Sequence, residues 1–384
     1  MDFNNTQIAF AYKSDAELKK ARFLFGSLNI PGSVFFGKMM LKLVNAFNIP
    51  AEGLIKKSIF SHFCGGENLE NCVLSVHNLS AFGIKSILDL SIEGQKNEES
   101  FDQNEQLLAE NLSFSAETDA TPFSVFKVTA LGNADIMRDY VKGYPFTADQ
   151  ERIFQRVHNL ISLANEKGIS VLIDAEETWI QNFIDEVTER LMVEFNQKRA
   201  VVLQTIQLYR KDKLEYLQYL HHFCHSQGLI TGVKLVRGAY MEKERLEAKQ
   251  LETECLIQDD KTSCDDDFDS AIKFCINYIN DIVLIAATHN ENSCQLLIDL
   301  MKKAKLSKSH QHVWFAQLYG MSDNLSFNLS SEGYNVAKYL PYGPVMEVMP
   351  YLLRRAEENS SAQNQSAREL QLIRDELKRR KTVS

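Results

Sequence analysis

The spacing of apolar and polar positions changes near residue 78 of the chain. Before that point apolar residues recur at helical spacing, and Ser14-Asp15-Ala16-Glu17 has the form of a capping box that begins a helix. Further helical patterns cover Phe35–Phe47 and Ala51–Phe63, and Gly65-Gly66 interrupts them. We therefore expect residues 1–78 to form a helical arm that precedes the main domain.

After residue 78, short apolar runs alternate with amphipathic stretches. Eight runs have the length and composition of buried strands: Ile84–Ser91, Ser124–Leu131, Ser170–Asp174, Ala200–Thr205, Gly232–Val236, Val283–Thr288, His312–Leu318 and Val336–Leu340. The helical patterns between them include Ala148–Lys167, Trp179–Lys198, Lys213–Gln227, Asp269–Asn280 and Asn292–Lys305. This alternation predicts an α/β fold, a (βα)₈ barrel of the TIM type over residues 79–361, with a doubly wound sheet as the alternative. Residues 362–384 are expected to form a charged C-terminal helix or tail.

The composition of the chain excludes some classes of protein. Its 384 residues are 45% hydrophobic, and 42 basic against 51 acidic residues give a formal net charge of −9. A nucleic-acid-binding protein would show a basic stripe, and none is present. Lys378-Arg379-Arg380-Lys381 is a basic cluster that we interpret as a solvated helix end, with weak contact to anionic lipid as the alternative. No run approaches 18 apolar residues, the length that a membrane-spanning helix needs.

Cysteine usage and the N-terminus bear on the compartment. The seven cysteines are an odd number without a CxxC pair, which is typical of a reduced intracellular protein. The first residues show neither a basic segment followed by an apolar run nor an Arg- and Ser-rich composition. We therefore expect an intracellular protein, in a bacterial cytoplasm, with a mitochondrial location as the alternative.

Possible metal sites receive little support from the sequence. Asp174 and His289 alone would not complete a catalytic zinc site, which needs three protein ligands. The histidines of one predicted helix, at 221, 222 and 225, are interpreted as surface residues. The acidic run over residues 259–269 lacks the spacing of a calcium loop and is interpreted as a solvated loop and helix cap. We predict no metal site.

Polar and charged side chains recur at the carboxyl ends of the predicted strands, the end at which barrels of this kind carry their active sites. The cations among them are Lys127, Lys234, Arg237, Arg354 and Arg355, and Asp174 is the strongest carboxylate candidate. Such a set indicates an anionic ligand. Neither GxGxxG nor GxxxxGK[ST] occurs, so a Rossmann cradle and a P-loop are excluded.

The arginine pair stands in a predicted helix with Glu358 one turn further on. Spacings of three and four residues place Glu358 beside Arg355 and Arg354. Two guanidinium groups delivered in this way suit a carboxylate or a phosphate, although a surface salt-bridge helix would have the same pattern. A Schiff-base lysine at Lys127 or Lys234 is another alternative from the residues alone.

Several motifs, in one order, resemble the proline dehydrogenase family in its monofunctional form. The similarity covers roughly residues 50–361. The motifs are Phe126–Gly132, Ile173–Thr178, Thr205–Tyr209, Lys234–Tyr240, His289-Asn290-Glu291, Phe315–Met321 and Lys338–Pro344, which runs into Arg354-Arg355 and Glu358-Asn359.

The resemblance implies a (βα)₈ flavoenzyme that oxidises L-proline to Δ¹-pyrroline-5-carboxylate by hydride transfer to FAD and passes electrons to a membrane quinone. By position, the resemblance implies three catalytic residues, Asp174, Lys234 and Tyr339. The implied substrate-binding residues are Lys127, Tyr240, Arg354, Arg355 and Glu358. The implied FAD-binding residues are Ala175, Gln207, Arg237, Gly238, Ala239, Thr288 and His289. Glu67 resembles a residue that can pair with the arginines.

Two positions bear on chemistry and specificity. Lys234 stands where many relatives have arginine near the reactive flavin nitrogen, so a cation is kept but the planar fork is lost. A bulky Tyr339 beside the substrate ring favours proline over hydroxyproline. A hydroxyproline dehydrogenase, a Schiff-base or metal-dependent lyase, and a non-catalytic amino-acid sensor are the alternatives.

Overall fold

The computed structural model describes residues 1–28, 30, 52–91, 97–361 and 365–383. The predicted helix over Phe35–Phe47 lies outside the described residues. Where they are described, residues before position 81 are mainly helical, as predicted. The capping box at Ser14 is present: its backbone N–H donates to Glu17 Oε2 at 2.8 Å, and the backbone N–H of Glu17 donates to Ser14 Oγ at 3.3 Å.

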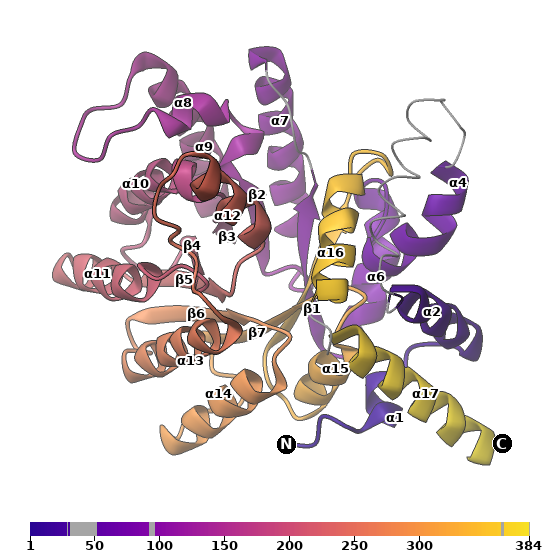
Figure 1. Ribbon diagram of the computed structural model, residues 1–384. Coiled ribbons are helices and arrows are strands. Elements are labelled where there is room, and N and C mark those ends of the chain that lie inside the picture. The colour runs from indigo at the N-terminus through magenta and orange to yellow at the C-terminus, as the bar shows by residue number, and fades with distance from the viewer. Residues whose placement is uncertain (29, 31–51, 92–96, 362–364, 384) are drawn as a thin grey trace.

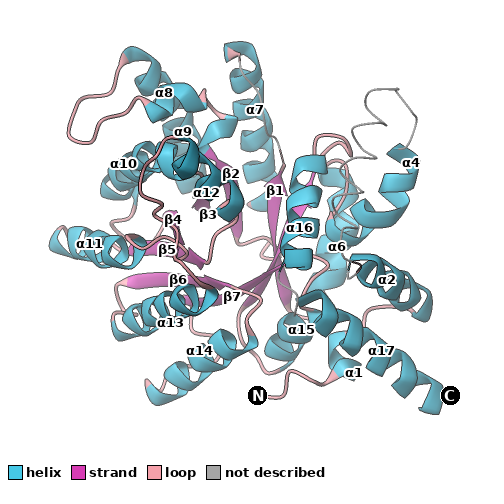
Figure 2. Ribbon diagram, in the orientation of Figure 1, coloured by secondary structure: helices cyan, strands magenta, loops and turns pink. Residues whose placement is uncertain are grey.

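Eight parallel strands close into a barrel in sequence order, which confirms the predicted fold (Figures 1 and 2). Closure joins the first strand to the last in a ladder that begins with Ile84 opposite Val336 and ends with Leu90 opposite Tyr342. The strands are β1 (Ile84–Leu90), β2 (Phe123–Lys127), β3 (Ser170–Asp174), β4 (Val202–Gln207), β5 (Thr231–Val236), β6 (Ile282–Ala287), β7 (Val313–Leu318) and β8 (Val336–Tyr342). Because these strands are buried on both faces, they appear in the sequence as apolar runs.

Helices surround the barrel and cover its apolar outer face (Figure 2). They are α7 (Glu98–Ser115), α9 (Ala148–Glu166), α10 (Thr178–Phe195), α11 (Lys213–Ser226), α13 (Lys261–Asn277), α14 (Glu291–Lys303) and α15 (Asp323–Ser331). Three more follow carboxyl ends of strands: α8 (Ala134–Arg138), α12 (Met241–Gln250) and α16 (Met349–Ser361).

The two ends of the chain pack together beside the barrel. The C-terminal helix α17 (Gln365–Val383) lies along α2 (Asp15–Leu28), as Figure 1 shows. Leu18 and Phe25 of α2 share one buried apolar cluster with Ile373 of α17. The other described N-terminal elements are α1 (Thr6–Ala9), α4 (Glu52–Ile55), the π-helical turn η1 (Lys56–Phe60), α5 (Ser61–Phe63) and α6 (Leu69–Ser80).

Two predicted elements differ from the structure. Strand β2 ends at Lys127, and Val128–Ala130 form a 3₁₀ turn instead of continuing the strand. The turn is held because Thr129 donates through both its backbone N–H and its hydroxyl to the buried carboxylate of Glu176.

The acidic run near residue 260 is the second difference. We interpret it from the sequence as a solvated loop and helix cap. The cap is confirmed, because the side chain of Asp260 accepts from the N–H of Ser263 at 2.8 Å, but the loop is wrong, because α13 already begins at Lys261. The later acids therefore lie inside the helix, where Asp265 contacts Arg237.

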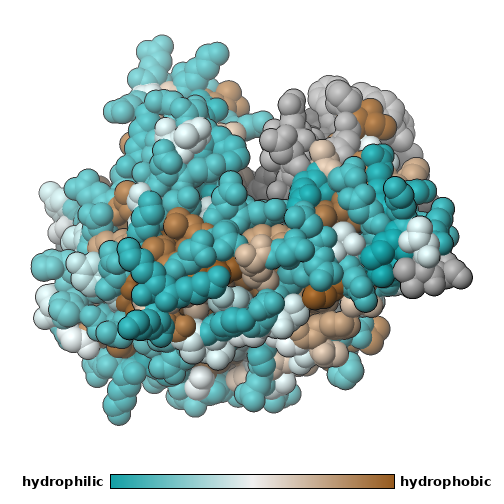
Figure 3. Space-filling view, turned by 90° about the horizontal axis from the view of Figure 1, so that it is seen from below, coloured by the Kyte–Doolittle hydropathy of each residue, from teal (hydrophilic) through white to brown (hydrophobic). Residues whose placement is uncertain are grey.

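One face of the molecule is mainly polar. Figure 3 shows this face, on which hydrophilic residues predominate and hydrophobic residues occur in smaller groups. Within the described ranges, no helix combines the length and apolarity that crossing a bilayer requires.

Candidate active site

A cavity of about 760 Å³ opens at the carboxyl ends of the strands. The predicted site residues that line it are Lys127, Asp174, Ala175, Gln207, Lys234, Arg237, Gly238, Ala239, Tyr240, Thr288, His289, Tyr339, Arg354 and Arg355. Glu358 belongs to α16, but its side chain lies outside the described part of the chain. The arginine pair therefore lines the cavity, which argues against the alternative of a surface salt-bridge helix.

Asp174 is the centre of a buried polar cluster. Lys234 Nζ donates to its Oδ1, and Tyr339 Oη donates to its Oδ2 at 2.9 Å. Burial by itself would raise the pKa of Asp174, but the charges of Lys234 and Lys127 and the two hydrogen bonds outweigh it and lower that pKa. The carboxylate is thus ionised and fixed in orientation.

Four barrel strands, β2, β3, β5 and β8, contribute the residues of this cluster. Lys127 and Asp174 are paired in the register between β2 and β3, which brings two opposite charges to the same level of the barrel. Lys234 Nζ lies 5.2 Å from the centroid of the Tyr339 ring. Burial, with the adjacent Asp174 charge, raises the pKa of Tyr339 well above its ordinary value, so this side chain is a neutral phenol.

Helix α16 contributes the two arginines to the lining of the cavity. Arg354 Cζ lies 5.9 Å from the centroid of the Tyr240 ring, and Arg355 Cζ lies 5.3 Å from that of Tyr351. Burial raises the pKa of Tyr240, while the charges of Lys127 and Arg354 oppose this shift. A neutral aromatic wall thus stands beside three cations, an arrangement suited to a small molecule with a carboxylate and an apolar body.

Arg237 joins the loops after β5 and β6. Its Nε donates to Asp265 at 2.6 Å, and its other nitrogens donate to Thr288 Oγ1 at 2.6 Å and to Ser293 Oγ at 3.0 Å. The next residue, Gly238, has φ of +143°, and a Cβ there would lie 2.4 Å from the Tyr209 ring. The hydrogen bonds of Arg237 and the close packing of Gly238 on Tyr209 therefore fix the shape of this part of the cavity wall.

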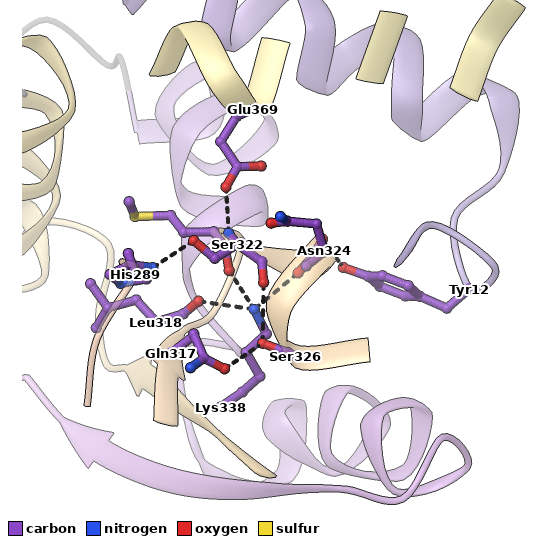
Figure 4. A network of polar contacts seen from close by, with 12 residues as sticks. Tyr12, His289, Gln317, Leu318, Ser322, Asn324, Ser326, Lys338 and Glu369 are labelled. Atoms are coloured by element: carbon purple, nitrogen blue, oxygen red, sulfur yellow. Dashed lines mark hydrogen bonds and ion pairs between the residues drawn. The ribbon is translucent and has the colours of Figure 1, made fainter. Parts of the chain in front are cut away.

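His289 is a neutral imidazole at the edge of the cavity. Burial, followed by the charges of Lys338 and Arg355, lowers its pKa to about 3. Its Nδ1 shares a hydrogen bond of 2.8 Å with the hydroxyl of Ser322, a non-glycine residue with φ of +50°. Ser322 is held in turn because its backbone N–H donates to Glu369 of α17 (Figure 4).

A buried ionic network lies behind this loop, and Figure 4 shows part of it. Lys338, which is 0% exposed, lies 3.0 Å from Oδ1 of Asp323 and also donates to backbone oxygens of the β7–α15 turn. Oδ2 of the same aspartate accepts from Tyr12 at 2.8 Å and from Lys13 at 2.7 Å. The N-terminal segment, β8 and the loop that contacts His289 therefore meet at one carboxylate.

Some cavity residues were not predicted from the sequence. Asp89, Lys261, Tyr351 and Arg368 also line the cavity. Arg368 comes from α17, beyond the motifs, where it donates to Glu291 at 3.0 Å, and no sequence signal pointed to it. Asp89 at the end of β1 could have been found by extending the strand-end rule to the first strand. Glu67 pairs with Lys56, and its pairing with the arginines remains a prediction.

A family model described as proline dehydrogenase matches residues 72–368. The carbapenem antibiotics biosynthesis protein CarD of Pectobacterium carotovorum subsp. carotovorum is 33% identical, over 86% of each chain. The mitochondrial proline dehydrogenase 1 of Dictyostelium discoideum is 28% identical over 98% of this chain and 74% of its own length. The hydroxyproline dehydrogenase of Xenopus laevis is 30% identical over 97% and 88%, respectively.

The fold matches solved structures as well. Proline utilization A from Bdellovibrio bacteriovorus superposes with a TM-score of 0.72 at 21% identity, over 93% of this chain and 36% of that longer chain. The similarity to this structure supports the barrel fold, and the family match rests on the sequence. The chain belongs to the proline dehydrogenase family and is an oxidoreductase of that family.

Proposed function

We propose that the chain oxidises L-proline to Δ¹-pyrroline-5-carboxylate, with FAD as hydride acceptor and a membrane quinone as electron acceptor. One observation carries the proposal: Lys127, Arg354 and Arg355 line the same cavity as the Asp174 cluster. A carboxylate bound by the cations would bring the attached ring towards Asp174, Lys234 and Tyr339.

The cations would bind the substrate and set its protonation state. Guanidinium groups bind carboxylates through charge-assisted hydrogen bonds of about 1.5–3 kcal/mol each. Nearby positive charge also disfavours a second cation, which favours the neutral ring amine. A neutral amine has the lone pair that forms the C=N bond when hydride leaves the adjacent ring carbon. Holding the carboxylate fixes the position of that carbon.

The cavity fits a flavin cofactor in size and in chemistry. Its volume of about 760 Å³ lies within the range of cofactor sites, and it carries cations from β5, α13, α16 and α17. Among the predicted residues, Gln207, Arg237, Thr288 and His289 would hold FAD, and Lys261 and Arg368 add positive charge suited to its diphosphate. Bound there, FAD would supply the acceptor for the hydride.

Hydroxyproline oxidation is a second candidate because one relative is a hydroxyproline dehydrogenase. Tyr339 distinguishes the two activities. Its ring is half-buried in the cavity wall and its hydroxyl donates to Asp174, which fixes the ring in the space that a substrate ring hydroxyl would need. We therefore propose L-proline as the preferred substrate.

The electron acceptor and the compartment are also proposals. Relatives named as mitochondrial enzymes make the mitochondrial alternative a candidate beside a bacterial inner-membrane location. A quinone acceptor implies peripheral contact with a membrane. Adding quinone-containing vesicles to reduced enzyme and following flavin reoxidation would test this contact directly.

The proposed activity is tested by the absorption spectrum of the purified protein. We expect bound flavin that anaerobic L-proline bleaches and that D-proline, the stereochemical control, leaves oxidised. Flavin that L-proline does not bleach would overturn the proposal and favour an amino-acid sensor. Colourless protein that borohydride traps with a carbonyl substrate would also overturn it and favour a Schiff-base lyase.

A further inference from the structure

We propose that His221, His225 and Asp281 form a site for a divalent transition-metal ion, Zn²⁺ in the first place. One ligand atom from each of these residues lies within 4.8 Å of the others. The site is at the amino end of the barrel, because Asp281 directly precedes β6, whereas the active-site cavity lies at the carboxyl ends. It is therefore independent of the proposed activity, and it revises the expectation that these histidines have no metal role.

The spacing of the ligand atoms suits a tetrahedral ion. Bonds of about 2.0–2.1 Å from zinc to nitrogen and oxygen place neighbouring ligand atoms roughly 3.3 Å apart. His225 Nδ1 and Asp281 Oδ2 are 3.2 Å apart. The two histidine rings are also adjacent. Residues four apart on a helix lie on one face, and the ring centroids of His221 and His225 are 5.7 Å apart. Small side-chain rotations would bring the third ligand to the same distance.

The surrounding structure holds two of the three ligands in place. The backbone N–H of Asp281 donates to Tyr278 at 3.0 Å, and its carbonyl accepts from the N–H of Thr231 at 2.8 Å. The His221 ring is buried against Tyr278, with centroids 4.6 Å apart, and its Nδ1 lies 3.4 Å from Thr231 Oγ1. With Nδ1 at that hydroxyl, Nε2 is the nitrogen available to a metal, an arrangement typical of metal-binding histidines.

The exposure of the site also favours metal binding. His225 and Asp281 are 64% and 39% exposed, which leaves water free to complete the coordination. As an ion pair alone, such an exposed contact would contribute little.

Metal binding would join α11 to the strand edge formed by β5 and β6. Helix α11 carries the two histidines and Asp281 directly precedes β6, so a bound ion would oppose local opening of α11. The expected effect is a rise in thermal stability with zinc, without a change in active-site chemistry.

The test uses the full chain, stripped of metal with a chelator and titrated with zinc by calorimetry and thermal denaturation. We expect one equivalent of Zn²⁺ to bind and to raise Tm, with no such response to Mg²⁺, which prefers oxygen ligands. His225→Ala and Asp281→Ala should weaken the binding by roughly 100-fold or more, because each removes a ligand. His222→Ala is the matched control, because this exposed neighbour lies outside the cluster, and it should bind zinc as the unmodified chain does.

Three results would overturn the proposal: no zinc response of the unmodified chain, equal weakening by His222→Ala, or undiminished binding by both ligand variants. Because all variants keep the cavity residues, their flavin content and reaction with proline should be unchanged. Failure of the proposed oxidation would leave the metal titration intact, so the two proposals are tested separately.

Discussion

The expected role of Arg354 and Arg355 depends on the aromatic rings and the lysine that line the cavity with them. Each guanidinium lies near an aromatic ring, and Lys127 approaches from β2, so three cations from two elements line one cavity. A pair of arginines on an exposed helix would have little energetic effect. Where the pair lines a cavity, we expect it to bind an anion through charge-assisted hydrogen bonds.

Arg355→Met should lower kcat/KM for L-proline by at least about tenfold, a loss of roughly 1.4 kcal/mol of transition-state stabilisation. Methionine keeps much of the side-chain volume and removes the charge. Steady-state kinetics with flavin content and Tm measured in parallel would check this. Arg152→Met, a change on the exposed face of α9, is the control. Unchanged kinetics in Arg355→Met would show that this arginine does not bind the carboxylate.

Tyr339→Ser should narrow the preference for proline over hydroxyproline by roughly tenfold or more, because it opens space beside the ring. The substitution also removes the hydrogen bond to Asp174, so kcat for both substrates should fall. The ratio of the two kcat/KM values separates these effects. Tyr339→Phe, which removes only the hydroxyl, should keep the preference. A ratio that stays the same in Tyr339→Ser would refute the steric explanation.

At the scale of elements, the turn between β7 and α15 depends on one glycine. Gly320 has φ of +77°, and a Cβ there would lie 2.3 Å from the backbone oxygen of His62. The His62 ring in turn contacts the Gly320 carbonyl at 2.9 Å. The N-terminal helices can therefore approach this turn only because residue 320 lacks a side chain.

Gly320→Ala should lower the free energy of unfolding by more than the roughly 1–2 kcal/mol that a positive φ alone costs. Gly168→Ala is a matched control, since Gly168 has φ of +74° but open space around its Cβ position. Denaturant unfolding of both variants measures the difference. Equal losses would mean that the contact with His62 adds nothing.

The elements that could be predicted from the sequence are those with a periodic signal. Buried parallel strands and amphipathic helices such as α9 and α11 were predicted within a few residues. The start of α13 was missed because a run of acidic residues is typical of a loop. In the structure Asp260 caps the helix and Asp265 accepts a hydrogen bond from Arg237. Site residues at strand ends could be predicted because active sites of such barrels lie at the carboxyl ends of the strands. Arg368 could not, because its helix reaches the cavity only through tertiary packing.

At the scale of the whole molecule, the Asp323 network joins segments that no sequence pattern connects. Lys13 and Asp323 are 310 positions apart, yet they form a buried ion pair. Burial would raise the pKa of Asp323, but Lys13 and Lys338 outweigh it and keep the carboxylate ionised. The N-terminal segment therefore contributes a second cation, which helps to keep Asp323 ionised beside Lys338.

Glu369 on α17 also belongs to this network, and its pKa is shifted upward, whereas that of Asp323 is shifted downward. Burial, followed by the charge of Asp323, raises its pKa to about 7 from an ordinary value near 4.5. Between those two pH values the folded protein holds a proton that the unfolded chain has lost. The stabilising contribution is therefore complete below about pH 4.5 and is lost as the pH rises through about 7, at about 1.4 kcal/mol per pH unit.

Glu369→Gln should remove a contribution to the unfolding free energy that falls between about pH 5 and pH 6.5, because an amide does not titrate there and can still accept from Ser322. Glu176, whose pKa burial also raises to about 7, contributes a slope of the same sign, whereas His62 and His289, whose pKa values burial lowers to about 3, contribute slopes of the opposite sign. Denaturant unfolding at several pH values, compared with the unmodified chain, measures the difference in slope, and adding Glu176→Gln should change the slope further in the same direction. If Glu369→Gln leaves the slope unchanged, Glu369 is ionised in the fold at neutral pH, and the two carboxylates of the network, Asp323 and Glu369, balance Lys13 and Lys338.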